Sequence, residues 1–222
     1  MEAREQRTFW ERHIASWSAS AYRQNQALPL IELIARPFRG HLRRRRDLGV
    51  ELVAKSGAAR VLELGCGTGE FAAALIRASP TLKGYLGFDI AEPAVARACE
   101  RLRLAAGSKV EYEVRTAAVE ELDPAAFTGF EFVVALGLLP YLTDDGLEKL
   151  AAICRGRKFL FDYHPSELSL TNVLHFIYRK AKGYPFYRIL SEQAVKEMVS
   201  RFGFGKFEIV RHGGSLRFVQ SV

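Results

Sequence analysis

The sequence predicts an α/β fold, with a seven-stranded, mostly parallel sheet, helices on both faces, N-terminal helices and one lid insertion. Three observations lead to this prediction. Residues 61–64 are apolar apart from one glutamate and run into a glycine cluster and then an apolar helical pattern, which is typical of a buried strand, a tight turn and a helix. Residues 130–138 are almost continuously apolar, which indicates a central parallel strand. Residues 204–210 and 216–221 flank a Gly-Gly pair, which indicates a closing hairpin.

The other elements follow from the spacing of apolar residues and turn formers. Helices are expected over residues 4–20, 21–35 and 41–55, where Pro37 and Gly40 should separate the second helix from the third. The other strands are expected near residues 86–90, 110–114 and 157–163.

The length of the chain, 222 residues, suits one well-cored domain with a small appendage. We expect a helical N-terminal cap over residues 1–58 and a sheet domain over residues 59–222. Within that domain, the connection at about 165–190 is long and rich in Phe and Tyr, so we interpret it as a lid over a substrate pocket. Contact of its basic amphipathic helix with a membrane surface is the weaker alternative, because the apolar face is needed to cover the sheet.

Composition excludes several classes of protein. The chain is 49% hydrophobic and 26% charged, as in globular proteins, and no apolar run approaches the ~20 residues of a membrane span. Its N-terminus is polar and has no apolar core of a signal peptide. Cys66, Cys99 and Cys154 are scattered without metal-ligand spacing, so we expect reduced thiols, no metal site and a cytoplasmic protein.

Charge is distributed unevenly along the chain. The net charge of +7 divides into +6 for residues 1–60, −6 for residues 61–150 and +7 for residues 151–222. Basic flanks can attract an anionic partner, either nucleic acid or a carboxylated or phosphorylated small molecule. The alternative is that basic helices simply pack beside an acidic core and keep the protein soluble.

The glycine cluster after the first strand has the composition of a nucleotide-binding turn. Gly65, Gly67 and Gly69 lack a Cβ, so the turn can adopt positive φ and let a ligand approach the backbone. Thr68 is predicted to cap the next helix, as Thr143 is predicted to cap a later one. Asp89 ends the second strand about twenty residues further on, where a ribose-binding carboxylate is expected.

With these elements together, the segment from Val61 to about Tyr141 resembles class I S-adenosylmethionine-dependent methyltransferases. The matching pieces are Val61-Leu62-Glu63-Leu64-Gly65-Cys66-Gly67-Thr68-Gly69, Gly87-Phe88-Asp89-Ile90 and Phe130-Glu131-Phe132-Val133-Val134-Ala135-Leu136-Gly137-Leu138-Leu139. The resemblance implies a Rossmann-like fold in which N-terminal helices lie over the cofactor. It also implies S-adenosylmethionine as the cofactor. The resemblance does not supply the substrate, and we expect methyl transfer to a hydroxyl, carboxyl or amine of a metabolite, for example in natural-product biosynthesis.

The resemblance also implies a set of cofactor-binding residues. Asp89 is expected to bind the ribose hydroxyls, and Glu63 to orient the amino group of the cofactor or the glycine loop. The full predicted set is Glu63, Gly65, Cys66, Gly67, Asp89, Ile90, Ala117 and Leu136.

The adenine side departs from the family pattern. Similar proteins often carry an acid soon after the third strand to bind the adenine amino group, but residues 115–120 here are Arg-Thr-Ala-Ala-Val-Glu. Thr116, the backbone of Ala117 and a displaced Glu120 are the candidates to replace that acid.

The acceptor side offers two candidate residues. Residues 138–141 are Leu-Leu-Pro-Tyr, where enzymes that methylate planar nitrogens often have Asn/Asp-Pro-Pro-Tyr/Phe, which argues against methylation of DNA bases. Tyr141 is a candidate to line the substrate site, with simple packing as the alternative. His164 follows the fifth strand on the reactive edge of the sheet, which makes it the candidate general base, with a loop histidine bonded to backbone as the alternative.

The run of arginines at 43–46 has two interpretations. One arginine could reach the carboxylate of the cofactor's methionine part or an anionic substrate. Otherwise the run is a solvated helix face with one buried arginine stem.

The sequence is therefore consistent with three functions. The first is methylation of a small acceptor, for which anionic and aromatic molecules are the candidates. The second is methylation of RNA, favoured by the basic flanks but without any appended RNA-binding module. The third is a non-catalytic subunit that keeps the fold, against which the intact glycine turn and Asp89 count. The acceptor atom and the oligomeric state do not follow from the sequence.

Overall fold

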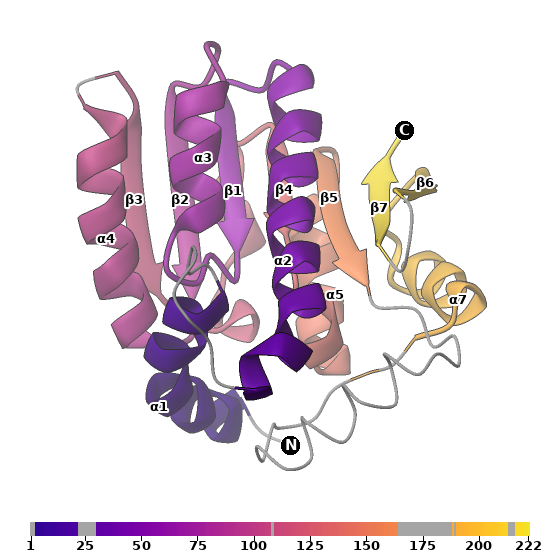
Figure 1. The fold of residues 1–222 in the computed structure, drawn as a ribbon. Helices are drawn as coiled ribbons and strands as arrows, with labels where there is room; N and C mark the ends of the chain where they lie inside the picture. The colour runs from indigo at the N-terminus through magenta and orange to yellow at the C-terminus, as the bar shows by residue number, and fades with distance from the viewer. Residues whose placement is uncertain (1–2, 22–29, 108, 164–187, 189, 213–215) are drawn as a thin grey trace.

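The computed structural model describes residues 3–21, 30–107, 109–163, 188, 190–212 and 216–222, with side chains given outside 15–39. Its sheet has seven strands in the order β3-β2-β1-β4-β5-β7-β6 (Figure 1). The strands are β1 (Arg60–Leu64), β2 (Gly84–Asp89), β3 (Glu111–Thr116), β4 (Phe132–Ala135), β5 (Lys158–Tyr163), β6 (Phe207–Arg211) and β7 (Arg217–Ser221). The first five run parallel, and β7 is antiparallel to both β5 and β6. The predicted fold class is confirmed.

The strand order reverses between β1 and β4, which are neighbours although two strands separate them in sequence. Connections leave β1 and β4 in opposite directions, so a crevice forms at their carboxyl ends, where α/β proteins bind ligands. The chain places its glycine turn and the loop after β4 at this point. We call this side of the sheet the carboxyl edge.

Helices cover both faces of the sheet, as predicted (Figure 1). Apolar residues of α2 and α3 pack with alternate residues of β1, β4 and β5 on one face, and α4 joins α3 over β2. Apolar residues of α5 and α7 pack on the other face. The helices are α1 (Ala3–Ala21), α2 (Leu30–Lys55), α3 (Glu70–Ala78), α4 (Glu92–Ala106), α5 (Asp144–Cys154) and α7 (Glu192–Phe202).

The loop after β4 begins earlier than the apolar run predicted. The strand ends at Ala135, because Gly137 has a φ of 74° and the chain then forms the short helix η3 (Leu139–Tyr141). Two further short helices, η1 (Val119–Glu121) and η2 (Pro124–Phe127), connect β3 to β4. The apolar residues after position 135 therefore line the end of the sheet rather than extend it.

The prediction of three helices before the first strand is wrong, because α2 continues through Pro37 and Gly40. An internal proline removes one backbone hydrogen bond. Packing of the second half of α2 supports the helix: Val50 and Val53 are buried, and Gly49 lies so close to the sheet that a Cβ would be 2.9 Å from Cδ1 of Leu136. The division of the chain at residue 58 remains a prediction.

Helix α1 lies across the carboxyl edge (Figure 1). Ile14 packs on Ala91 and Ala94, just after β2. Arg7 forms an ion pair with Glu121 of η1 at 3.0 Å, between β3 and β4. The side-chain amide of Gln6 donates to the carbonyl oxygen of Tyr141, after β4. One helix thus contacts the segments that follow β2, β3 and β4.

The predicted lid and the predicted Gly213-Gly214 turn lie almost wholly outside the described residues, and the lid remains a prediction. Strands β6 and β7 do pair as predicted. Arg188, near the end of the proposed lid, is described: its backbone N–H donates to the carbonyl of Pro140 at 2.7 Å, and its Nε donates to the carbonyl of Leu142 at 3.0 Å. The chain therefore returns from this segment beside η3.

Candidate cofactor site

The glycine turn is fixed by the geometry of its three glycines, whose φ values are 74°, 54° and 77°. A Cβ on Gly65 would be 3.2 Å from Leu138, and one on Gly69 would be 3.1 Å from the backbone of Ala98, so a side chain at either position would crowd its neighbour and would be strained by the positive φ. A Cβ on Gly67 would meet nothing within 4 Å. The backbone at Gly67 is therefore open to a ligand.

Hydrogen bonds tie this turn to β2. The N–H groups of Gly65 and Cys66 both donate to the carbonyl of Phe88, at 2.8 and 2.9 Å. The N–H of Gly67 donates to Oδ2 of Asp89 at 2.8 Å, and the N–H of Ala91 donates to Oδ1 at 3.0 Å. Burial raises the pKa of Asp89, and these backbone donors act in the opposite direction. Each carboxylate oxygen has a further lone pair, so Asp89 can still accept from two ribose hydroxyls.

Glu63 lies beneath the turn, on the face of the sheet covered by α2 and α3. Its side chain is buried, and its Oε2 accepts a hydrogen bond from the hydroxyl of Tyr85 at 2.6 Å. Burial raises the pKa of Glu63 to about 8, with further contributions from the negative charges of Asp89 and Glu70. A carboxyl with this pKa is mostly protonated at neutral pH. Orientation of the cofactor by Glu63 remains a prediction.

Replacing Glu63 with glutamine should change how stability depends on pH. The pKa of Glu63 is about 8 in the folded protein against 4.5 for a free glutamate, so the stability it contributes is fully present below pH 4.5 and is lost as pH rises through 8. Glutamine stays neutral, so the variant should gain stability relative to the wild type between about pH 5 and about pH 9, by on the order of 4 kcal/mol. Urea unfolding at the two pH values measures this difference.

The matched control for that experiment is Glu131→Gln. Glu131 is an exposed glutamate that also accepts a hydrogen bond, from the N–H of Ala59 at 2.9 Å. Its stability difference from the wild type at each pH gives the effect of replacing a hydrogen-bonded glutamate outside the glycine turn. Parallel pH profiles for Glu63→Gln and the wild type would contradict the raised pKa.

Thr68 does not cap α3, so that prediction is wrong. The N-cap residue is Gly69, and no side chain caps the helix. The hydroxyl of Thr68 instead donates to the carboxylate of Glu70 at 2.6 Å. Arg101 of α4 pairs with the other oxygen of Glu70 at 2.9 Å and donates to the carbonyl of Thr68. Arg101 of α4 thus holds the Thr68–Glu70 part of the turn in place.

The three candidates for the adenine side differ in their contacts. The N–H of Ala117 donates to the backbone carbonyl of Asp89 at 3.0 Å. Glu120 accepts from the hydroxyl of Thr143 at 2.9 Å, at the start of α5. Thr116 is exposed at the end of β3. The structure therefore turns Ala117 and Glu120 toward protein partners, which leaves Thr116 as the more accessible candidate.

The other predicted cofactor residues border the same crevice. Cys66 is buried in the turn, where burial raises the pKa of its thiol, as expected for a small packing residue. Ile90 is half-buried directly after Asp89, and Leu136 is half-buried directly after β4. Their contacts with a cofactor remain predictions.

On the acceptor side, Tyr141 lies at the end of η3 with its ring edge-on to Trp10 of α1, at 5.3 Å between centroids and an interplanar angle of 83°. His164 lies outside the described residues, and its role remains a prediction. It directly follows Tyr163, the last residue of β5.

The sequence did not single out Asp162, although the structure places it next to the arginine run. Nη1 of Arg45 lies 3.3 Å from Oδ2 of Asp162, and Oδ1 accepts from the N–H of Gly137 at 2.5 Å. The side chains of Arg45 and Asp162 are only 16% and 9% exposed. An acid at the penultimate position of a buried strand was the signal that could have found it.

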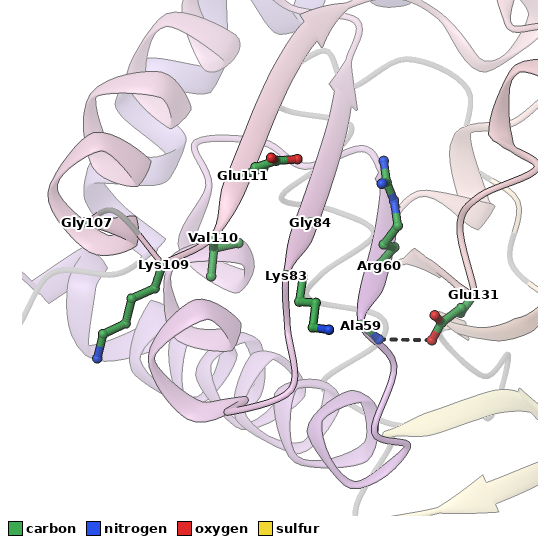
Figure 2. Close-up of a pocket in the computed structure, with 9 residues that line it drawn as sticks. All are labelled: Ala59, Arg60, Lys83, Gly84, Gly107, Lys109, Val110, Glu111 and Glu131. Carbon is green, nitrogen blue, oxygen red and sulfur yellow. Dashed lines mark hydrogen bonds between the residues drawn. The ribbon is translucent and has the colours of Figure 1, made fainter.

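A hollow of about 530 Å³ lies far from this crevice, at the amino ends of β1, β2 and β3 (Figure 2). Its rim carries both signs of charge, including Arg60, Lys83, Lys109, Glu111 and Glu131. Ligands of parallel α/β sheets bind at the opposite edge. Among the described residues, no cluster of three His, Cys, Asp or Glu side chains could hold a metal ion, and no helix could cross a membrane.

Comparison with known proteins agrees with this geometry. Residues 61–156 match the family model of a methyltransferase domain. A search of curated protein sequences found no match.

Three solved structures illustrate the similarity of the fold. The magnesium protoporphyrin IX methyltransferase ChlM from Synechocystis PCC 6803, solved with bound S-adenosylmethionine, is 15% identical, with a TM-score of 0.72 over 98% of this chain and 95% of its own. The small RNA methyltransferase HEN1 is 14% identical, with a TM-score of 0.61 over 89% of this chain and 26% of its own. The pyocyanin biosynthetic protein PhzM is 19% identical, with a TM-score of 0.56 over 73% of this chain and 49% of its own.

The glycine turn fits the S-adenosylmethionine bound in the ChlM structure, because a Cβ on Gly67 would meet no protein atom within 4 Å and Asp89 ends β2 at the carboxyl edge. With the confirmed fold, the family match identifies residues 61–156 as a methyltransferase domain, and the fold is that of an enzyme solved with S-adenosylmethionine and with S-adenosylhomocysteine.

Proposed function

We propose that the enzyme methylates a hydroxyl, carboxyl or amine of a small molecule. The observation that carries this proposal is the composition of the crevice beside the glycine turn. Most residues beside it are apolar or aromatic: Leu136 and Leu138 follow β4, and Tyr141 meets Trp10 of α1. The Arg45–Asp162 pair at Gly137 adds two charged groups. The apolar and aromatic residues suit a compact acceptor with an apolar or aromatic body. The end-to-end similarity to an enzyme of magnesium protoporphyrin IX supports it at the level of the fold.

S-adenosylmethionine supplies an activated methyl group on a positively charged sulfur. The protein's own task is to align the acceptor and exclude water, because proximity provides most of the rate in such a displacement. In the proposed site, Gly65 and Gly67 give the cofactor access to the backbone, and Asp89 accepts from the ribose hydroxyls. Helix α1 covers the carboxyl edge and shields it from solvent.

We further propose that His164 removes the acceptor's proton. Replacing His164 with alanine should lower kcat about 100-fold or more at neutral pH, which is within the range typical of general-base catalysis. The Kd for the cofactor should stay unchanged. Steady-state kinetics with the identified acceptor, together with calorimetric titration of S-adenosylhomocysteine, measures both.

His212→Ala is the control for that substitution. His212 lies after β6, two strands from β5, with its ring against Phe218. Unchanged turnover of a folded His164→Ala variant would remove the general-base role.

Methylation of RNA is the second candidate, supported by the basic flanks and by the likeness of the fold to a small RNA methyltransferase. One assay separates the two: cofactor consumption against a panel of metabolites and RNAs, with products detected by their mass shift. Methylation of a metabolite without methylation of any RNA would support the first proposal. Methylated RNA, with binding that weakens steeply as salt rises, would replace it by the second.

A further inference from the structure

Helix α4 contacts the glycine turn at two points on one of its faces. A Cβ on Gly69 would lie 3.1 Å from the backbone of Ala98, so the turn lies directly against the helix there. Three residues further along, Nη1 of Arg101 donates to the carbonyl of Thr68 and pairs with Oε1 of Glu70 at 2.9 Å. Residues three apart are neighbours on a helix surface. The turn is therefore held from the side of α4 by packing and by charge.

The contacts of Arg101 form a closed ring with two residues of the turn. The hydroxyl of Thr68 donates to Oε2 of Glu70 at 2.6 Å, so Glu70 uses one oxygen for Thr68 and the other for Arg101. Because Arg101 also donates to the carbonyl of Thr68, both the backbone and the side chain of Thr68 are fixed. Thr68 is buried, and the side chain of Glu70 is only 12% exposed. Charge-assisted hydrogen bonds are stronger in such a sheltered place than in water.

The amino end of α4 is fixed by the carboxylate that is proposed to bind the ribose. Asp89 accepts from the N–H of Gly67 in the turn and from the N–H of Ala91, the N-cap residue of α4. Arg101 lies ten residues beyond Ala91, about three turns along the same helix. One rigid element thus connects the two sides of the turn, through Asp89 at its start and through Arg101 further along.

Glu70 places a negative charge at the turn. It is the first residue of α3, where a negative charge is favourable, and no side chain caps that helix. Its charge also acts on Glu63 beneath the turn, where it helps to raise the pKa of that carboxyl. Arg101 balances the charge of Glu70 from the side of α4. Without Arg101, the carbonyl of Thr68 would lose a donor and Glu70 would lose a positive partner.

We propose that Arg101 and Glu70 are positioning residues for cofactor binding, which hold Thr68 so that the open backbone of Gly67 meets the nucleoside part of the cofactor. This inference rests on the proposed cofactor site. In this role both side chains act through the backbone of the turn, and neither needs to touch the cofactor. The affinity for every ligand that carries the nucleoside should therefore depend on them to the same extent.

The test is calorimetric titration of Arg101→Gln and Glu70→Gln with two ligands. S-adenosylhomocysteine and 5′-methylthioadenosine share the nucleoside, and only the first carries the amino-acid part. Each variant should weaken binding of both ligands by the same factor, about tenfold. Arg101→Lys keeps the charge without the planar fork, so its affinities should lie between those of the wild type and of Arg101→Gln. Thermal unfolding confirms that each variant is folded.

The double variant Arg101→Gln/Glu70→Gln shows whether the two side chains act as one unit. If they do, it should bind no more weakly than the weaker of the two single variants. Two controls should bind both ligands like the wild type. Arg103→Gln changes an exposed arginine on the same helix, and Arg211→Gln removes another Arg–Glu ion pair, the one with Glu192 of α7.

The outcomes separate the inference from the proposal beneath it. A purely structural ion pair would lower the thermal midpoint of Arg101→Gln and leave both dissociation constants unchanged, which would overturn the positioning role. Weaker binding of S-adenosylhomocysteine alone would also overturn it, because the effect would then lie at the amino-acid part of the ligand. Losses that add in full in the double variant would overturn the joint action. If the wild type binds neither ligand, the cofactor site itself is wrong and the inference fails with it.

Discussion

Replacing Asp89 with alanine should lower the affinity for S-adenosylmethionine by about 100-fold or more. Two losses combine in this variant. A hydrogen bond to a charged group contributes about 1.5–3 kcal/mol, and the ribose offers two such donors to Asp89. The N–H of Gly67, which donates to Asp89 at 2.8 Å, also loses its partner, so the turn loses the contact that shapes it.

Isothermal titration with S-adenosylmethionine and S-adenosylhomocysteine measures this effect. Both ligands should weaken equally, since both carry the same ribose. Glu131→Ala is the control, because Glu131 also accepts a backbone hydrogen bond but lies at the amino ends of the strands (Figure 2). Wild-type affinity in a folded Asp89→Ala variant would show that Asp89 only shapes the turn and does not contact the cofactor.

Replacing Gly67 with alanine should abolish detectable cofactor binding while leaving the fold nearly as stable. A Cβ there meets no protein atom within 4 Å, so it would project into the space proposed for the cofactor. The φ of 54° adds backbone strain of about 1–2 kcal/mol for a residue with a side chain. The thermal midpoint should therefore fall by only a few degrees, as differential scanning fluorimetry can measure.

Gly57→Ala provides a closely matched control for this variant. Gly57 has a φ of 71°, and a Cβ on it would also meet nothing within 4 Å, but it lies between α2 and β1 at the other edge of the sheet. The two variants should lose similar stability, and only Gly67→Ala should lose the cofactor. Equal cofactor affinity in both variants would mean that the open side of Gly67 does not face the cofactor.

Features that depend on neighbouring residues could be predicted from the sequence. The glycine turn follows from a buried strand, three glycines and an apolar helix in one stretch, and Asp89 follows from a fixed spacing to it. Thr143 caps α5 as predicted, by accepting from the N–H of Gly146 at 3.1 Å. In each case the deciding contact lies within a few residues or within one βαβ unit.

Features that depend on residues distant in sequence could not be predicted from the sequence. Thr68 has the composition of a cap, but Glu70 and Arg101 engage this residue and Gly69 takes the N-cap position. Pro37 has the signature of a helix end, but the packing of the rest of α2 supports one continuous helix.

Asp162 illustrates the same limit of sequence-based prediction within the candidate site. Its position near the end of a buried strand marks it as an unusual acid, but its partner lies 117 positions away. A single sequence without its fold does not contain that pairing. The structure was needed to bring α2 and β5 together at Gly137.

The hydrogen bonds of the glycine turn have a consequence for the thermodynamics of binding. The N–H groups of Gly65 and Cys66 are bound to Phe88, and that of Gly67 to Asp89, so the turn is held in shape by the protein's own contacts. Such a preorganised loop loses little conformational entropy when a ligand arrives. The ribose should therefore bind to a rigid cradle, and discrimination between methylated cofactor and demethylated product must arise from the charge on sulfur rather than from ordering of the loop.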